Sequence, residues 1–267
     1  MRIFASSDLH TDFKENWLLV QKVSSIAYQN DALIVAGDIA DELEIIEETL
    51  LLLRSKFRHV LFVPGNHELW VRSGDCDSVE KLHLLLQWCD ESDIQTRPAK
   101  IDGLWIVPLF SWYHPSFDLE DDEEFSAELE GWADFHLCRW PAEVHDISNF
   151  FLRMNEANIR PYDAPVISFS HFLPRRDLLP ARETLKFKSL PKVAGCSSLD
   201  YQIRELNSII HVFGHSHIDC DREIDGVRYV QNALRYPRER QGSSNLLKKI
   251  WGPECPGELW TGTRDNG

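Results

Sequence analysis

The stretch Leu33-Ile-Val-Ala-Gly37-Asp38-Ile-Ala-Asp41 indicates the fold class of this chain. Four apolar residues lead into Gly37, and a short continuous apolar run is typical of a strand that is buried on both faces. Gly37 lets the backbone turn sharply where this strand ends. Asp38 then follows at the carboxyl end of the strand, which is where open α/β sheets place their chemistry. Its carboxylate has two oxygens, so it is able to bridge two cations.

Four more apolar runs lead into Asp, Asn or His in the same way. The run from Arg2 leads into Asp8-Leu-His10, and the run from Val60 leads into Gly65-Asn66-His67-Glu68. The run from Val166 leads into His171, and the run from Ile209 leads into Gly214-His215-Ser-His217. Each of these residues has an ordinary alternative, because Asp and Asn cap helices and a single His is often structural. Five such runs in one chain instead favour one shared site of metal-ligating side chains.

Taken in order, the five motifs resemble the signature of the calcineurin-like metallophosphoesterases. That signature is Asp-x-His, Gly-Asp-x-x-Asp, Gly-Asn-His-Asp/Glu, a single His and Gly-His-x-His, and the resemblance extends from Asp8 to His217. It implies an α/β fold in which two packed mixed β-sheets are flanked by helices, a four-layer αββα sandwich. We expect one phosphoesterase domain over residues 1–236, and a C-terminal tail over residues 237–267 that packs on the body or is partly flexible.

The resemblance also implies two divalent metal ions. Its first ligand set is Asp8, His10, Asp38 and His217, and its second set is Asp38, Asn66, His171 and His215. Carboxylate, amide and imidazole ligands together suit Mn, Fe or Zn better than Ca²⁺. The implied enzyme is a metal-dependent phosphoesterase that hydrolyses a phosphomonoester or a phosphodiester by attack of a hydroxide bridging the two metals.

His67 follows a predicted ligand but holds no metal in this scheme. The resemblance implies that it acts as the general acid, or stabilises the departing oxygen. Asp41 could orient and charge this imidazole, or it could cap a helix over residues 42–56, and both roles stay open. In the protein Ser/Thr phosphatase branch an Arg-Gly pair follows the second Asp of the motif. Here Glu42-Leu43 stands in that place, which disfavours a phosphoprotein substrate.

Three further residues are candidates for substrate binding. Arg175 and Arg176 could pair with phosphate or form a solvated loop pair, and His114 could contact the substrate or lie in a surface loop. The segment 111–141 is rich in aromatic and acidic residues, and its acidic run 118–124 is either solvated loop or part of a lid insertion over the metals. The remaining histidines match no motif and are read as structural: His59, His83, His136, His145 and His211.

Periodicity and turn residues predict the remaining elements. Apolar spacing predicts helices over residues 15–29, 42–56, 78–90, 143–159 and 198–207. Asp102-Gly103 and Asp225-Gly226 predict hairpin turns. In the tail, Trp251 and Trp260 suggest that part of the segment packs back on the body.

Composition narrows the class of protein further. The chain has 267 residues and is 43% hydrophobic, which suits one large domain. Its net charge of −15 disfavours nucleic acid as a partner, so a nuclease is a weaker alternative. We expect a small phosphate-ester substrate and no membrane association, and the sequence leaves the oligomeric state open. The six cysteines form no C-x-x-C pair and no signal region precedes the first strand, so we expect a cytoplasmic protein with free thiols. A catalytically silent scaffold of the same fold would lack ligands, and none is missing here.

Overall fold

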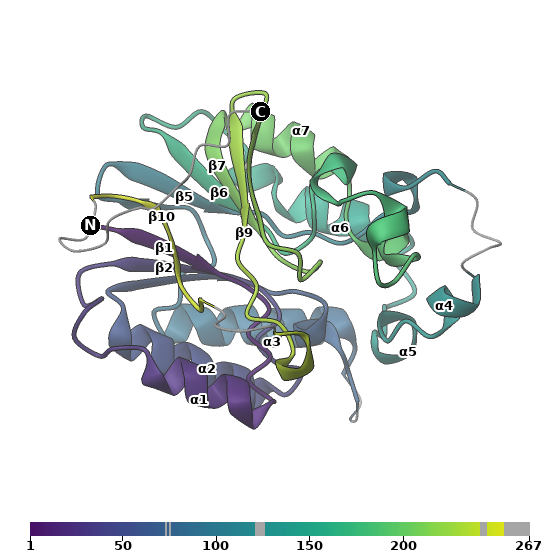
Figure 1. Ribbon diagram of the computed structural model, residues 1–267, viewed down its shortest axis with the longest axis horizontal. Coiled ribbons are helices and arrows are strands. Elements are labelled where there is room, and N and C mark those ends of the chain that lie inside the picture. Colours follow the sequence, from purple (N-terminus) through teal and green to yellow (C-terminus); the bar gives the residue numbers. More distant parts are fainter. Residues whose placement is uncertain (73, 75, 121–125, 241–244, 254–267) are drawn as a thin grey trace.

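Two mixed sheets pack face to face, and helices cover their outer faces (Figure 1). The computed structural model describes residues 1–72, 74, 76–120, 126–240 and 245–253. The four-stranded sheet has the order β10-β1-β2-β3, and the six-stranded sheet has the order β4-β5-β6-β7-β9-β8. The strands are β1 (Ile3–Ser6), β2 (Ala32–Ala36), β3 (His59–Val63), β4 (Ala99–Ile101), β5 (Leu104–Pro108), β6 (Val166–Phe169), β7 (Ser208–Phe213), β8 (Cys220–Ile224), β9 (Val227–Gln231) and β10 (Lys248–Trp251). This arrangement confirms the predicted αββα fold class.

Strand β2 shows why the run before Gly37 is apolar throughout. It lies between β1 and β3 and is parallel to both. Leu33 and Val35 pack under the helices, whereas Ile34 and Ala36 face the six-stranded sheet. Because successive side chains of a strand point to opposite faces, a strand with both faces covered needs apolar residues at every position.

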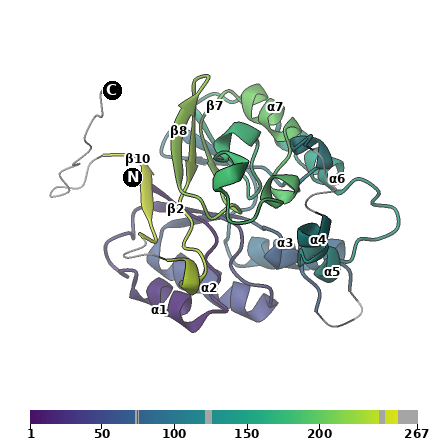
Figure 2. The same cartoon turned by 45° about the vertical axis from the view of Figure 1, so that its right-hand side comes forward.

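The helices lie mainly on the outer faces of the two sheets. Helices α1, α2 and α3 cover the four-stranded sheet, and α6 and α7 lie on the side of the six-stranded sheet (Figure 1). Helices α4 and α5 belong to the segment 111–141 and lie at one edge of the molecule in Figure 1, the edge that is turned forward in Figure 2. The helices are α1 (Lys14–Lys22), α2 (Leu43–Lys56), α3 (Ser78–Glu91), α4 (Ser126–Glu130), α5 (Asp134–Leu137), α6 (Ile147–Met154) and α7 (Ser198–Glu205).

Two helices are shorter than their apolar periodicity predicts. Helix α1 ends at Lys22 because the ammonium of Lys56 binds its last carbonyls, including that of Val23 at 2.6 Å. The Ser24 hydroxyl then accepts from the backbone N–H of Ala27 at 3.1 Å and forms a turn instead of a continuing helix. Helix α6 begins only after Asp146, whose side chain caps it. It ends at Met154, and a separate 3₁₀ turn over Glu156–Asn158 follows it. The predictions of α-helix over residues 23–29, 143–146 and 155–159 are therefore wrong.

The hairpins and part of the tail agree with the predictions. Asp102-Gly103 joins β4 to β5, and Asp225-Gly226 joins β8 to β9. Strand β10 pairs antiparallel with β1, so this part of the tail is an edge of the four-stranded sheet. Ile250 is the buried side chain of that strand and Trp251 is 40% exposed, whereas Trp260 lies outside the described residues.

The acidic run 118–124 is not simply a solvated loop. Asp118 is buried and forms ion pairs with Arg182 and Lys192, and Glu120 pairs with Arg182 at 2.6 Å. These contacts join the segment 111–141 to the loop that follows β6. Residues 121–125 lie outside the described residues.

The described cysteines have free thiols: Cys76, Cys89, Cys138, Cys196 and Cys220. Cys255 lies outside the described residues. Over the part of the chain that the structure describes, every helix is too short or too polar to cross a membrane.

Candidate metal centre and active site

The predicted ligands lie on strained backbone at the strand ends. Five of the seven have a positive φ, namely Asp8 (53°), His10 (43°), Asp38 (57°), His215 (70°) and His217 (56°). Non-glycine residues rarely adopt this left-handed conformation, and it costs about 1–3 kcal/mol per residue unless the surroundings hold it. Backbone bonds between the loops provide this support, for example from Asp8 N–H to the Gly37 carbonyl at 2.9 Å. Such clustered strain is typical of functional sites.

The first set of donors combines residues from the two ends of the domain. Nε2 of His217 lies 3.1 Å from Nε2 of His10 and 3.3 Å from a carboxylate oxygen of Asp8. The other ring nitrogen of His217 lies 2.7 Å from the Glu239 carboxylate. Nδ1 therefore donates its proton to Glu239, and the lone pair of Nε2 faces the site.

The second set surrounds the end of β6. Oδ1 of Asn66 lies 3.1 Å from both Nε2 of His171 and Nδ1 of His215, and these two nitrogens are 3.3 Å apart. A carboxylate oxygen of Asp38 lies 3.4 Å from Nε2 of His171, which confirms the expected proximity of these two residues. Nδ1 of His171 donates to the carbonyl of Ala36 at 2.8 Å, so its Nε2 lone pair also faces the site.

These donors fit divalent cations. Oxygen and nitrogen donor atoms of both sets face one another in a buried space. The second ring nitrogens of His10 and His215, Nδ1 and Nε2 respectively, have no hydrogen-bond partner among the described residues. The site also favours positive charge. Although burial opposes the charged form, Asp38 raises the pKa of His171 to about 9, and Asp8 raises the pKa of His217 to about 10. Cations held by these residues would take the place of those protons.

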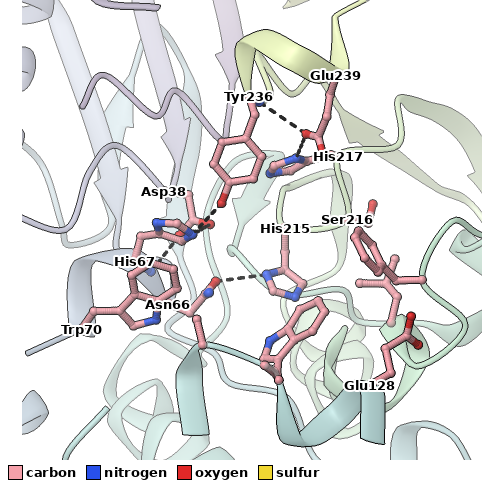
Figure 3. A pocket seen from close by; sticks show the side chains of 15 residues that line it. Asp38, Asn66, His67, Trp70, Glu128, His215, Ser216, His217, Tyr236 and Glu239 are labelled. Carbon is pink, nitrogen blue, oxygen red and sulfur yellow. Dashed lines mark hydrogen bonds and ion pairs between the residues drawn. The ribbon is translucent and has the colours of Figure 1, made fainter. Parts of the chain in front are cut away.

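His67 lies beside the metal donors and faces the pocket (Figure 3). Its Nε2 is 3.0 Å from the hydroxyl of Tyr236 and 3.9 Å from a carboxylate oxygen of Asp38. Its ring centroid is 3.6 Å from that of Trp70. Burial lowers the pKa of His67. A donor atom of His67 also lies within 4.8 Å of donors from His10 and Asp38, so a cation is within its reach.

The structure gives Asp41 neither of its predicted contacts. Its carboxylate pairs with Arg72. The N-cap of α2 is Glu42, and no side chain caps that helix, so the capping prediction is wrong. The hydrogen-bond partner found for the His67 ring is Tyr236, from the far end of the chain. Asp41 acts on His67 only through its charge, which raises the pKa of that ring slightly against the larger effect of burial.

Glu68 is the last residue of the motif Gly65-Asn66-His67-Glu68, and the sequence predicted no role for it. It is completely buried and accepts hydrogen bonds from the backbone N–H groups of Asp38 (3.0 Å), Ile39 (2.5 Å) and Gly65 (2.6 Å). Burial and the charge of Asp38 raise the pKa of Glu68 to about 7. The carboxylate thus holds together the two loops that carry Asp38 and Asn66.

A cavity of about 320 Å³ opens onto these residues (Figure 3). The metal donors Asp38, Asn66, His215 and His217 line it together with His67. Glu128, Trp132, Phe187 and Leu190 also line it. The segment 111–141 therefore supplies part of the binding cavity, as the lid hypothesis requires. The sequence predicted no role for four residues around the site, namely Trp70, Asp134, Tyr236 and Glu239, whereas Trp132 is one of the aromatic residues of the segment 111–141.

The predicted substrate residues do not line this cavity. Arg175 pairs with Asp177 at 2.8 Å and also contacts Asp200 and Asp225. Arg176 lies 3.9 Å from Asp118. His114 bonds to Ser116 and lines a separate cavity beside Trp112 and Trp140.

Comparisons with known proteins identify the family. The family model for calcineurin-like phosphoesterase matches residues 1–219. The chain is 30% identical over 287 residues to the acyl-carrier-protein phosphodiesterase PptH of Mycobacterium tuberculosis (strain ATCC 25618 / H37Rv), covering 96% of this chain and 86% of that protein. The crystal structure of phosphopantetheinyl hydrolase (PptH) from Mycobacterium tuberculosis matches with a TM-score of 0.78 at 26% identity, covering 95% of this chain and 98% of that one. This chain therefore belongs to the calcineurin-like phosphoesterase family, whose members use divalent metal ions, and it is a hydrolase of phosphoric ester bonds.

Proposed function

We propose that this chain is a dimetal phosphodiesterase that releases a phosphopantetheinyl group from a carrier protein. The observation that carries the proposal is the convergence of two donor sets at Asp38, which belongs to candidate metal groups with His10 and His67 on one side and with His171 and His215 on the other. Metals in such pairs lie about 3.5–4 Å apart and clamp a transferring phosphoryl group. The mixed donor set suits Mn, Fe or Zn.

The relatives support a phosphodiester rather than a small monoester. The related PptH proteins carry the names acyl-carrier-protein phosphodiesterase and phosphopantetheinyl hydrolase. The cavity supports a substrate with an extended, partly apolar arm, because Trp132, Phe187 and Leu190 line it together with the metal donors. We therefore replace the small phosphate ester expected from sequence with a protein-linked phosphodiester.

The residues around the metals have separate tasks. Bound divalent cations supply Lewis-acid stabilisation of the phosphoryl oxygens and lower the pKa of water. Asp38 would hold both ions, and Glu239 fixes His217 so that its Nε2 faces the place where the first ion would bind. His67 gives a proton from Nε2 to the leaving oxygen. The Tyr236 hydroxyl, 3.0 Å from this nitrogen, marks where an oxygen in the cavity forms a hydrogen bond with it.

The experiment compares substrates on metal-stripped protein reloaded with Mn²⁺. We expect hydrolysis of a phosphopantetheinylated acyl carrier protein, seen by mass spectrometry as loss of the phosphopantetheinyl group, and hydrolysis of bis(p-nitrophenyl) phosphate. Asp38→Asn should lose activity and at least one ion, because an amide cannot supply two anionic oxygens. Hydrolysis of p-nitrophenyl phosphate alone would overturn the phosphodiesterase proposal. Two tightly held ions in Asp38→Asn would overturn the bridging role.

A further inference from the structure

Asp134 is a buried carboxylate for which the reaction above has no use. It begins α5, in the segment 111–141, and only 3% of its surface is exposed. Its Oδ1 accepts from Nδ2 of Asn66 at 2.9 Å and from Nε1 of Trp70 at 2.7 Å, and its Oδ2 accepts from Nε1 of Trp132 at 3.0 Å. Three N–H groups thus point at its two oxygens, as an ionised carboxylate requires.

The bond to Asn66 decides which end of that amide faces the metal donors. The two ends of an amide group have nearly the same shape, but only the oxygen binds a cation. Asp134 accepts from Nδ2, so Oδ1 points to His171 and His215, at 3.1 Å from each. The reversed amide would place its oxygen against the carboxylate of Asp134 and its NH₂ group in the metal site.

The same carboxylate holds two tryptophans that shape the active site. Trp70 contacts the ring of His67, with the ring centroids 3.6 Å apart. Trp132 lies beside the ring of His215, with the centroids 6.4 Å apart and the planes tilted by 58°, and it lines the cavity. One residue of the segment 111–141 therefore connects a metal ligand, the proposed general acid and the cavity wall.

We propose that Asp134 is a positioning residue that keeps Oδ1 of Asn66 directed at the second metal. The segment 111–141 then completes the metal centre and does more than cover it. The inference rests on the proposed dimetal function for its consequence in catalysis. Its geometry is independent of the substrate. Residues that orient metal ligands typically change metal affinity by about 10–100-fold when they are replaced.

The test titrates metal-free protein with Mn²⁺ alone in a calorimeter. We expect Asp134→Ala to weaken binding of one ion by about 10-fold or more and to leave the other ion unchanged. Asp134→Asn keeps the shape of the side chain and can still accept from Asn66, so it should fold and show a smaller loss. Asp118→Asn is the matched control. It removes another buried carboxylate of the same segment, one that pairs with Arg182 and Lys192, and should bind both ions as the wild type does.

The outcomes separate this inference from the proposed function. Wild-type affinity for both ions in folded Asp134→Ala, or in Asp134→Asn if the Ala variant does not fold, would overturn the role of Asp134. An equal loss in Asp118→Asn would also overturn it, because general loosening of the segment would then explain the effect. Failure of the wild type to act on carrier-protein substrates would overturn the phosphodiesterase proposal alone, since the metal titration does not depend on it.

Discussion

Replacing Gly65 by Ala tests the geometry of the metal centre most directly. Gly65 lies where two predicted ligands approach the backbone. An added Cβ would lie 2.7 Å from Nε2 of His171 and closer still to Oδ1 of Asp38. Ordinary contact begins near 3.4 Å. The imidazole of His171 would therefore have to move by about 0.7 Å, more than the roughly 0.5 Å that a working site tolerates.

The displacement predicts loss of metal and of activity together. A misplacement of about 1 Å can lower a rate by about 10²-fold, so we expect kcat/KM to fall by about that factor or more. The affinity for the ion held by His171 should fall as well. Overpacking should also lower the free energy of unfolding by about 1–3 kcal/mol. Metal analysis, calorimetric titration with Mn²⁺ and hydrolysis of bis(p-nitrophenyl) phosphate measure these changes.

Gly103→Ala separates the effect on the site from a general loss of stability. Gly103 lies in the turn between β4 and β5 with φ of +80°, and a Cβ there would meet no atom within 4 Å. The left-handed conformation alone should cost about 1–2 kcal/mol, with metal content and kcat/KM unchanged. If Gly65→Ala bound both ions and turned over like the wild type, Asp38 and His171 could not lie where the structure places them.

Two further predictions concern the histidines. His67→Ala should keep both ions and lower kcat by about 10²–10⁴-fold with little change in KM, and less for esters with a nitrophenolate leaving group. An equal loss for good and poor leaving groups would exclude the general-acid role, and a lost ion would make His67 a ligand. His211 is buried between Ser168 and Ser170, and burial lowers its pKa to about 3 from 6.5. Between these two pKa values the unfolded chain therefore binds a proton on His211 that the folded chain does not bind. The free energy of unfolding falls as the pH falls through this window, and the loss at pH 5 is about 2 kcal/mol. Urea unfolding of His211→Gln should lack this part of the loss between pH 7 and pH 5, and an unchanged loss would contradict it.

The fold class, and the grouping of the predicted ligands in one place, could be predicted from sequence because both depend on short local patterns. An apolar run that ends in Gly37-Asp38 specifies a strand and a turn within a few residues. Parallel strands such as β1, β2 and β3 bring their carboxyl ends to one edge of a sheet, so side chains that follow them meet. The helix ends were predicted less well, because apolar periodicity does not show contacts such as the one from Lys56 of the next helix to the carbonyl of Val23 at the end of α1.

Charge and residue type alone did not identify the residues that contact the substrate cavity. Arg175 had the right chemistry for phosphate, yet its guanidinium pairs with Asp177 of the same loop and with Asp200 and Asp225 from later in the chain. Asp118 belonged to an acidic run typical of a solvated loop, but it is buried against Arg182 and Lys192. A sequence shows that a charged side chain is present, and only the folded chain decides which oppositely charged residue pairs with it.

By itself the sequence determined which side chains can hold metal and that they follow successive strands. The tertiary structure decided what orients them. Asn66 is 68 residues from Asp134, and His67 is 169 residues from Tyr236. These contacts depend on side-chain direction across packed layers, and no local propensity encodes them. A ligand motif is read from a few adjacent residues, whereas its supporting hydrogen bonds arise only when distant segments are brought together by the burial of the core.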